Sequence, residues 1–152
     1  MVPMNTWLTP VIFLISAAVT GGETRIAMSD DGHFWIQASI NGLPRRFLVD
    51  TGATLTAISE DTAAAASVPA RSISQSVTLR TANGKVQAEL ATIAELRFGN
   101  VIARDLDAVV APGLGETNVI GMNLLSRLAS WRVEGRTLVL VPNAAQKAPG
   151  QG

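Results

Sequence analysis

The stretch that decides the fold is Phe-Leu-Val-Asp-Thr-Gly-Ala-Thr-Leu-Thr-Ala-Ile-Ser, residues 47–59. Three apolar residues lead directly into Asp50, and the sequence becomes apolar again a few residues later. This pattern indicates two buried segments joined by a tight loop, so we expect Asp50 to lie where desolvation penalises a charge. Gly52 allows a tight turn that presents its amide N–H to the carboxylate, and the hydroxyl of Thr51 can hydrogen-bond across a close interface.

Composition narrows the function classes. The chain has 152 residues, enough for one domain with a real core, and its 12 Lys plus Arg balance 12 Asp plus Glu. This balance disfavours nucleic-acid binding. The absence of Cys excludes disulfides and thiolate nucleophiles, and His33 is the single histidine. We interpret His33 as a residue at the start of a strand rather than a catalytic base, and expect no metal and no cofactor.

Residues 1–22 carry no charged side chain and contain an apolar run over residues 7–19. The run is short for a spanning helix, which needs about 20 residues, and Pro10 interrupts it. Small residues at its end suit signal cleavage, so residues 1–22 are interpreted as a signal peptide or membrane anchor. A mis-chosen start codon or a truncated anchor is the alternative. A globular domain should follow over residues 23–142, and residues 143–152 form a disordered tail.

The rest of the chain has the pattern of an all-β fold with one or two short helices. Two Asn-Gly pairs, at residues 41–42 and 83–84, predict tight hairpins. The first hairpin should deliver Asp50 at the end of its second strand. Expected strands cover residues 34–40, 45–49, 77–81, 84–88, 91–98, 101–103, 106–110, 131–134 and 137–141.

Two short helices are expected. Ser59 is a good N-cap for a helix through residue 66, with acidic residues in its first turn. Gly121 follows two β-branched residues and should open a second helix. Its apolar face would be formed by Met122, Leu125, Leu128 and Ala129.

Two motifs carry a family resemblance. Asp-Thr-Gly-Ala at residues 50–53, after Phe-Leu-Val, resembles the catalytic loop of the retropepsin-like aspartic proteases. Val-Ile-Gly-Met-Asn-Leu-Leu at residues 119–125 is similar to the strand and helix beside that loop in the bacterial membrane-linked branch of the family. The resemblance implies a closed barrel-like fold of six strands with one lobe per chain. Either interpretation of residues 1–22 implies that the domain is exported or membrane-anchored, and we expect it in the periplasm.

The resemblance assigns roles to the loop. It implies that Asp50 is catalytic, that the Thr51 hydroxyl grips the loop of a partner and that Gly52 donates its amide. Because the chain has one Asp-Thr-Gly, activity implies a C2 homodimer in which two Asp50 carboxylates share a proton. Such a dimer would be an endopeptidase acting on polypeptides. Ala53 replaces the hydroxyl residue of pepsin, which predicts a less acidic pH optimum than that of pepsin.

The second Asn-Gly hairpin resembles the protease flap, with Thr81, Ala82, Asn83, Gly84 and Lys85 as the residues expected to close over an extended peptide. An ordinary surface hairpin is the alternative. For the whole chain, the alternative function is a catalytically silent protease-like domain that binds a peptide or partner. A nucleotide-binding module has no phosphate loop to support it.

Overall fold

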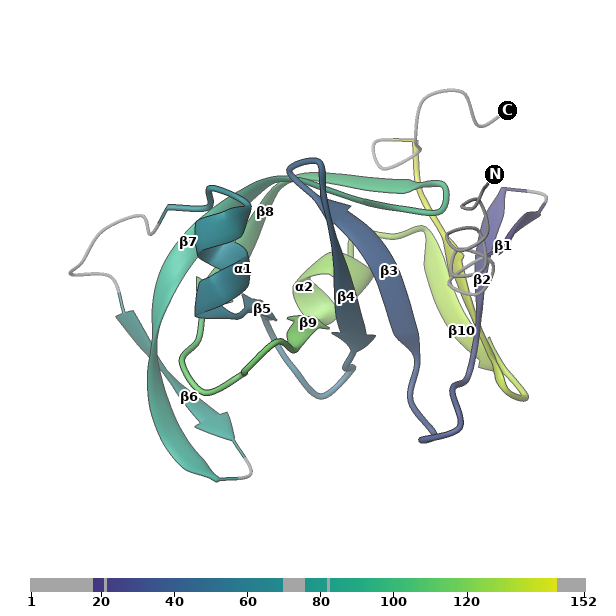
Figure 1. Cartoon of the computed structure of the whole chain (residues 1–152). Coiled ribbons are helices and arrows are strands. Elements are labelled where there is room, and N and C mark those ends of the chain that lie inside the picture. Colours follow the sequence, from purple (N-terminus) through teal and green to yellow (C-terminus); the bar gives the residue numbers. More distant parts are fainter. Residues whose placement is uncertain (1–17, 21, 70–75, 82, 145–152) are drawn as a thin grey trace, which may run out of the picture.

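The computed structural model describes residues 18–20, 22–69, 76–81 and 83–144 (Figure 1). Most of the expected signal peptide or anchor, Ala82 of the expected flap, and the expected tail from residue 145 onward lie outside the described residues. Within the described ranges, no helix is long and apolar enough to cross a membrane. The division of the chain at residues 22 and 142 stays a prediction.

The described elements are mostly strands, with two short helices. In chain order they are β1 (Ala18–Thr20), β2 (Glu23–Ala27), β3 (Trp35–Ile40), β4 (Leu43–Val49), β5 (Thr56–Ile58), α1 (Glu60–Ala65), β6 (Ser76–Thr81), β7 (Gly84–Phe98), β8 (Val101–Val110), β9 (Asn118–Ile120), α2 (Met122–Leu125), β10 (Ser130–Glu134) and β11 (Thr137–Val141).

Six strands form a closed barrel. The neighbours run β3-β4-β9-β5-β8-β7, and a short pairing between β3 and β7, Ser39 with Arg97 and Ile40 with Leu96, closes the ring. β6 extends this sheet as the outer strand of a hairpin with β7, which projects from the barrel in Figure 1. The predicted all-β fold with a six-stranded barrel and short helices is confirmed.

At one point the order of strands in the barrel departs from their order in the chain, and this departure positions Asp50. β9 lies between β4 and β5, although these two strands are joined by the loop that carries Asp50. β9 runs parallel to β4, with Phe47, Leu48 and Val49 opposite residues 118–120. The loop from β4 to β5 therefore passes over the end of β9, so residues far apart in the sequence fix its conformation.

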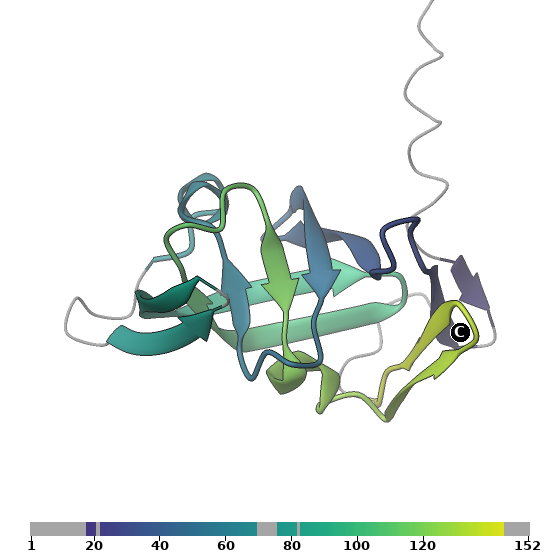
Figure 2. The same cartoon turned by 90° about the horizontal axis from the view of Figure 1, so that it is seen from below.

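A second sheet packs beside the barrel, in the order β1-β2-β11-β10 (Figures 1 and 2). We call it the terminal sheet. Sequence patterning missed β2, whose Thr24 and Ile26 are buried, and placed no strand at β1. The buried amide of Asn100, in the turn between β7 and β8, donates to the carbonyl of Gly22 at 2.7 Å and contacts the Thr24 hydroxyl, which ties β2 to the barrel.

The core divides into two clusters. The larger one fills the barrel and includes fully buried Ile36, Phe47, Ile93 and Ile120. The smaller cluster, Ala57, Ala88, Val109 and Ala111, lies where the β6–β7 hairpin leaves the barrel, and partly buried residues of that hairpin pack against it. Burial of the larger cluster supplies most of the driving force for folding.

Local predictions held with three corrections. The Asn41-Gly42 turn has positive φ at both residues, 49° and 86°, as a tight hairpin needs, and Ser59 caps α1 by accepting from Thr62 N at 3.1 Å. However, β7 and β8 are long continuous strands of 15 and 10 residues, because cross-strand pairing continues through the polar positions expected to end them.

The predicted extent of the second helix was wrong. α2 spans four residues, and Leu124, expected off the apolar face, is buried while Ala129 is exposed. The chain leaves the helix after one turn, so helical periodicity no longer applies beyond Leu125: Leu128 is still buried in the core, but Ala129 is not. β2 was missed because its charged residues interrupt the apolar pattern.

Candidate active site

Asp50 stands at the end of β4, in a loop whose backbone is held on both sides. Its amide donates to Ile120 O at 3.0 Å, and its carbonyl accepts from Ala53 N at 3.1 Å. The carboxylate Oδ1 accepts from Gly52 N at 2.8 Å, the contact expected from the sequence. The amide of Gly52 therefore orients one oxygen of the carboxylate.

The expected burial of Asp50 is not found in the single chain. Phe47 and Ile58, which flank the loop at a distance, are fully buried, but Asp50, Thr51 and Gly52 are exposed. The turn projects from the open end of the barrel, and no part of the described chain covers it. The apolar neighbours in sequence belong to the strands and say nothing about the loop between them.

Gly121 sets how closely β9 and α2 approach this loop. A Cβ at Gly121 would lie 2.6 Å from the carbonyl carbon and oxygen of Leu55 and 2.9 Å from Ala53 O. The next residue, Met122, donates its amide to Ala53 O at 2.7 Å. This contact requires a residue without a side chain, so Gly121 is dictated by the loop and not by its own backbone angles.

Asn123 fixes the far end of the loop. Its Oδ1 accepts from both the amide and the hydroxyl of Thr56, each at 2.9 Å, and its Nδ2 donates to Asp107 O at 2.6 Å. The Thr56 hydroxyl in turn accepts from Gly121 N at 3.2 Å. One amide side chain thereby joins α2, β5 and β8 just after the loop.

Asn118 performs a similar role at the start of β9. It is fully buried; its Oδ1 accepts from Ser59 N at 3.0 Å and its Nδ2 donates to Arg46 O at 3.2 Å. It therefore bridges β4 and the end of β5 where β9 begins to separate them. These bonds satisfy backbone groups that would otherwise be buried without partners.

A cleft of about 780 Å³ opens between the Asp50 loop and the β6–β7 hairpin. Asp50 is the single acidic residue among the described residues that line it. The lining otherwise consists of Gly52, Ala53, Thr54, Leu55, Ala57, Val77, Thr78, Leu79, Arg80, Thr81, Asn83, Val86, Val109, Ala111, Pro112, Gly113, Leu114 and Val119. The cleft is thus largely apolar, with a carboxylate at one side.

The expected flap residues are divided between cleft and solvent. Thr81 and Asn83 line the cleft, whereas Gly84 and Lys85 are exposed residues outside its lining. The Thr81 hydroxyl donates to Gly84 O at 2.8 Å and accepts from Asn83 N at 3.2 Å, which shapes the hairpin tip. The hairpin occupies the position of a flap, and the role of its residues in binding stays a prediction.

Sequence reasoning missed the residues that support the loop. Asn118, Asn123 and Thr56 were given no role, although a polar residue inside an otherwise apolar strand or helix was a usable signal. Residues 111–114, in the connection between β8 and β9, were also given no role, and the structure places them in the wall of the cleft. No local signal pointed to that, because the contact depends on the barrel closing.

Other titratable groups lie away from the cleft. His33 comes just before β3, as predicted, and its Nδ1 is 3.5 Å from the Asp31 carboxylate. The Trp35 indole N–H, which donates to Asp31 at 2.8 Å, and the His33 amide lower the pKa of Asp31. Among the described residues, no group of three or more His, Cys, Asp or Glu side chains could hold a metal ion.

Comparison with known proteins gives consistent matches. A protein-family model described as gag-polyprotein putative aspartyl protease matches residues 36–127, a segment that includes the Asp50 loop, the hairpin, β9 and α2. The crystal structure of a retropepsin-like aspartic protease from Rickettsia conorii superposes with a TM-score of 0.68 at 31% identity, covering 78% of this chain and 89% of that one.

Two curated relatives are themselves uncharacterized. One, from Rickettsia prowazekii (strain Madrid E), is 29% identical over 92% of this chain and 56% of its own length. The other, from the cobV 5′ region of a Sinorhizobium species, is 33% identical over 64% of this chain and 42% of its own length. The chain therefore spans about half the length of these relatives. The matched segment, the barrel and the placement of the Asp-Thr-Gly loop agree: the chain belongs to the retropepsin-like aspartic protease family.

Proposed function

We propose that two copies of this chain form a homodimeric aspartic endopeptidase that hydrolyses peptide bonds in polypeptides. Asp50 is the catalytic residue, and one carboxylate comes from each subunit. The observation that carries the proposal is the placement of a single acidic side chain, hydrogen-bonded to the Gly52 amide, beside a cleft of peptide size and exposed in the described part of the chain.

The chemistry needs a second carboxylate. In aspartic proteases, two carboxylates a few ångströms apart retain one proton between them, because like charges at such a distance cannot both ionise. The ionised member takes a proton from water, and the protonated member polarises the scissile carbonyl. The described residues of one chain supply one acidic side chain to the cleft. The simplest source of the second carboxylate is therefore Asp50 of another copy, related to the first by a twofold axis beside the loop.

The substrate would bind in extended form beneath the β6–β7 hairpin. Apolar lining from Leu55, Val77, Leu79 and Leu114 supplies surface for side chains of a polypeptide, and the hairpin backbone supplies hydrogen-bonding groups. Thr51, exposed next to Asp50, is the residue proposed to contact the loop of the second subunit. No cofactor is required by this mechanism.

The test compares Asp50→Asn with Asp30→Asn. Both are exposed aspartates, but Asp30 lies in the connection between β2 and β3, outside the cleft lining. Asp50→Asn should abolish cleavage of an unfolded protein substrate without changing the dimer, measured by sedimentation. Asp30→Asn should cleave like the parent. If the parent bound peptides without cleaving them, the alternative of a catalytically silent binding domain would replace the protease.

We propose further that residues 1–22 export the domain or attach it to a membrane, which would place the protease in the periplasm. The support is the uncharged apolar run of that segment. Fractionation of cells that produce the full chain would test it: a product found only in the cytoplasm with its first residues intact contradicts export.

A further inference from the structure

The cleft wall contains one basic side chain among the described residues, that of Arg80. Arg80 lies near the end of β6, the outer strand of the β6–β7 hairpin, and it is exposed. No hydrogen bond or ion pair joins its guanidinium to another described residue. Arg25 and Arg132, by contrast, each contact two glutamates. Within the described ranges, the positive charge of the cleft wall therefore has no counterion.

Arg80 stands directly opposite a second cation. β6 and β7 pair antiparallel, with Arg80 opposite Lys85. Residues directly opposite one another share a face of the hairpin, and like charges in that position are destabilising. The preceding pair on this face, Thr78 and Gln87, is joined by a side-chain hydrogen bond of 3.2 Å. The end of the hairpin thus holds two positive charges where a pair of opposite charges would be more stable.

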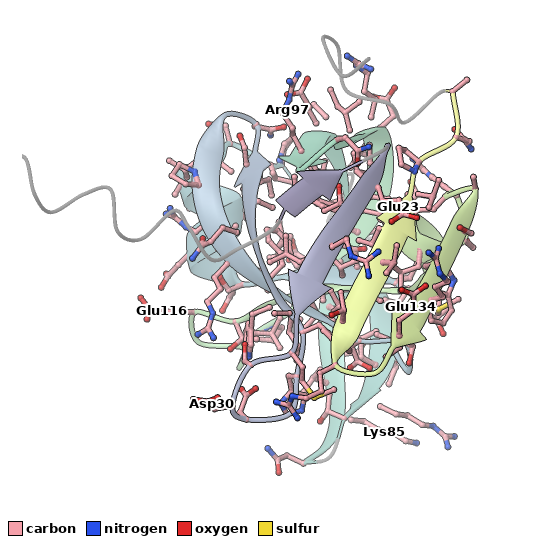
Figure 3. All side chains as sticks on the ribbon, turned by 90° about the vertical axis from the view of Figure 1, so that its right-hand side faces the viewer. Glu23, Asp30, Lys85, Arg97, Glu116 and Glu134 are labelled. Carbon is pink, nitrogen blue, oxygen red and sulfur yellow. The ribbon has the colours of Figure 1, made fainter. Side chains whose placement is uncertain are left out.

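The carboxylates of the hairpin lie too far away to neutralise these two charges. Along the same face the first described carboxylate is that of Glu89, which stands opposite Ser76. Glu89 follows Lys85 by four positions in β7, about 13 Å along the strand, and salt screens exposed charges over that distance. Figure 3 shows Lys85 at the end of the hairpin that projects from the barrel. This end is therefore positively charged.

The two cations differ in their position relative to the cleft. Arg80 lines the cleft, whereas Lys85 is exposed outside its lining. A guanidinium is planar, donates two parallel hydrogen bonds to a carboxylate and stays charged over the whole pH range in which a protein works. Arg80 is therefore the cation that a carboxylate inside the cleft would meet.

We propose that Arg80 is a specificity-determining residue that binds a glutamate or aspartate side chain of the polypeptide substrate. Cleavage sites with an acidic residue near the scissile bond are then preferred over neutral ones. A substrate carboxylate supplies the missing counterion of Arg80 and offsets its repulsion from Lys85. The inference rests on the proposed function, because it takes the polypeptide in the cleft to be the substrate of the Asp50 pair.

The twofold axis of the proposed dimer doubles this preference. An isologous dimer has one Arg80 in each subunit, and the two lie on opposite sides of the axis that relates the Asp50 carboxylates. An extended peptide across both carboxylates therefore passes one Arg80 before the scissile bond and the other after it. The preferred acidic residues should occur at two positions, about equally far from the scissile bond.

A series of peptides tests the preference. Each position around the scissile bond of a cleaved peptide is changed in turn to Glu, Gln and Lys. At one position on each side, the parent enzyme should have a kcat/KM about fivefold higher for the Glu peptide than for the Gln peptide. Because the contact is between exposed charges, about 1 M salt should bring this ratio close to one.

Three variants separate a direct contact from the general field of the hairpin. Arg80→Gln should bring the ratio of Glu to Gln peptides to about one, and Arg80→Glu should favour the Lys peptide instead. Lys85→Gln removes the same charge at the directly opposite position, outside the cleft lining, so it should keep most of the ratio. Equal losses in Arg80→Gln and Lys85→Gln would contradict a direct contact with Arg80.

The same preference can be measured without cleavage. In the Asp50→Asn variant, fluorescence anisotropy of labelled Glu and Gln peptides should give dissociation constants that differ about fivefold. Adding Arg80→Gln should remove the difference. Sedimentation equilibrium of Arg80→Gln should give the same dimer dissociation constant as the parent.

The outcomes distinguish this inference from the proposed function. If the parent cleaves polypeptides without a preference for Glu, or with a preference that survives Arg80→Gln, the Arg80 proposal fails while the proposed function stands. If peptides bind with a preference that depends on Arg80 but are not cleaved, the proposed function fails and Arg80 keeps its role in binding. A weaker dimer of Arg80→Gln with an unchanged peptide ratio would assign Arg80 to the subunit interface and overturn this inference.

Discussion

The side chain of Asn123 accepts two hydrogen bonds from one residue, Thr56, through its amide and its hydroxyl, each at 2.9 Å. The residues are 67 positions apart in the sequence. Thr56 begins β5 directly after the Asp50 loop and is fully buried. Through these two hydrogen bonds, Asn123 of α2 fixes the position of Thr56, the residue at which the Asp50 loop ends.

Replacement of Asn123 should affect catalysis more than stability alone explains. Asn123→Ala leaves two donors of Thr56 without a partner, which costs about 1–3 kcal/mol of unfolding free energy. Because the end of the Asp50 loop is released, kcat should fall at least about tenfold with a smaller change in KM. Steady-state kinetics and urea unfolding on the same preparations measure both effects.

Asn100→Ala is the matched control for that variant. Asn100 is also a buried asparagine with side-chain bonds across the fold, to Gly22 and Thr24, but it lies in the turn between β7 and β8, outside the cleft lining. It should lose a similar amount of stability and keep its kcat. Equal losses of kcat in both variants would show that Asn123 acts through general stability.

Gly121→Ala should be among the most damaging single substitutions. The added methyl would stand 2.6 Å from backbone atoms of Leu55, and backbone cannot move aside as a side chain can. We expect a loss of about 3 kcal/mol or more in unfolding free energy. Gly113→Ala is the comparison: its Cβ would meet no atom within 4 Å, so it should cost about 1–2 kcal/mol from its φ of 83° alone.

Ala53→Ser should move the pH optimum of peptidase activity downward. Ala53 lines the cleft and its amide donates to Asp50 O, so a serine hydroxyl at this position comes within reach of the carboxylate of the same loop. A donor to the carboxylate favours its ionised form and keeps one carboxylate of the pair charged at lower pH. The parent should have a bell-shaped profile with an optimum well above pH 2; an optimum near pH 2, or no shift in the variant, contradicts this account.

Acid should weaken the terminal sheet through its two glutamates. Arg132 and Arg25 lower the pKa of Glu23 and of Glu134 through direct hydrogen bonds. A carboxyl whose pKa is lowered by folding contributes stability above its ordinary pKa of 4.5, and that contribution is lost as pH falls through the folded value. The midpoint temperature of unfolding should therefore fall as the pH is lowered below 4.5. In the Glu134→Gln variant this fall should be smaller. Because these groups are exposed, 1 M salt should flatten it as well.

The sequence predicted those parts of the fold whose cause is local. The Asn41-Gly42 turn has positive φ at both residues, so the first hairpin was predictable from its turn, and Ser59 was recognisable as a helix cap. The second hairpin also forms, and Gly84 has positive φ, but Gly84 already pairs with Thr81 as the first residue of β7. The Asp50 loop was recognisable because Asp-Thr-Gly follows an apolar strand, and the expected contact from Gly52 N to the carboxylate is present.

By itself, then, the sequence determined the residues of the candidate site and the class of the fold: one aspartate, its amide donor, and enough strands for a barrel. Only the tertiary structure decided how that aspartate is held and how far it is exposed. It placed β9 between β4 and β5, recruited Thr56, Asn118 and Asn123 from separate elements, and left Asp50 exposed instead of buried. The physical reason is that these features depend on strand order and close approach across the barrel, which join residues too distant in the chain for any local pattern to report.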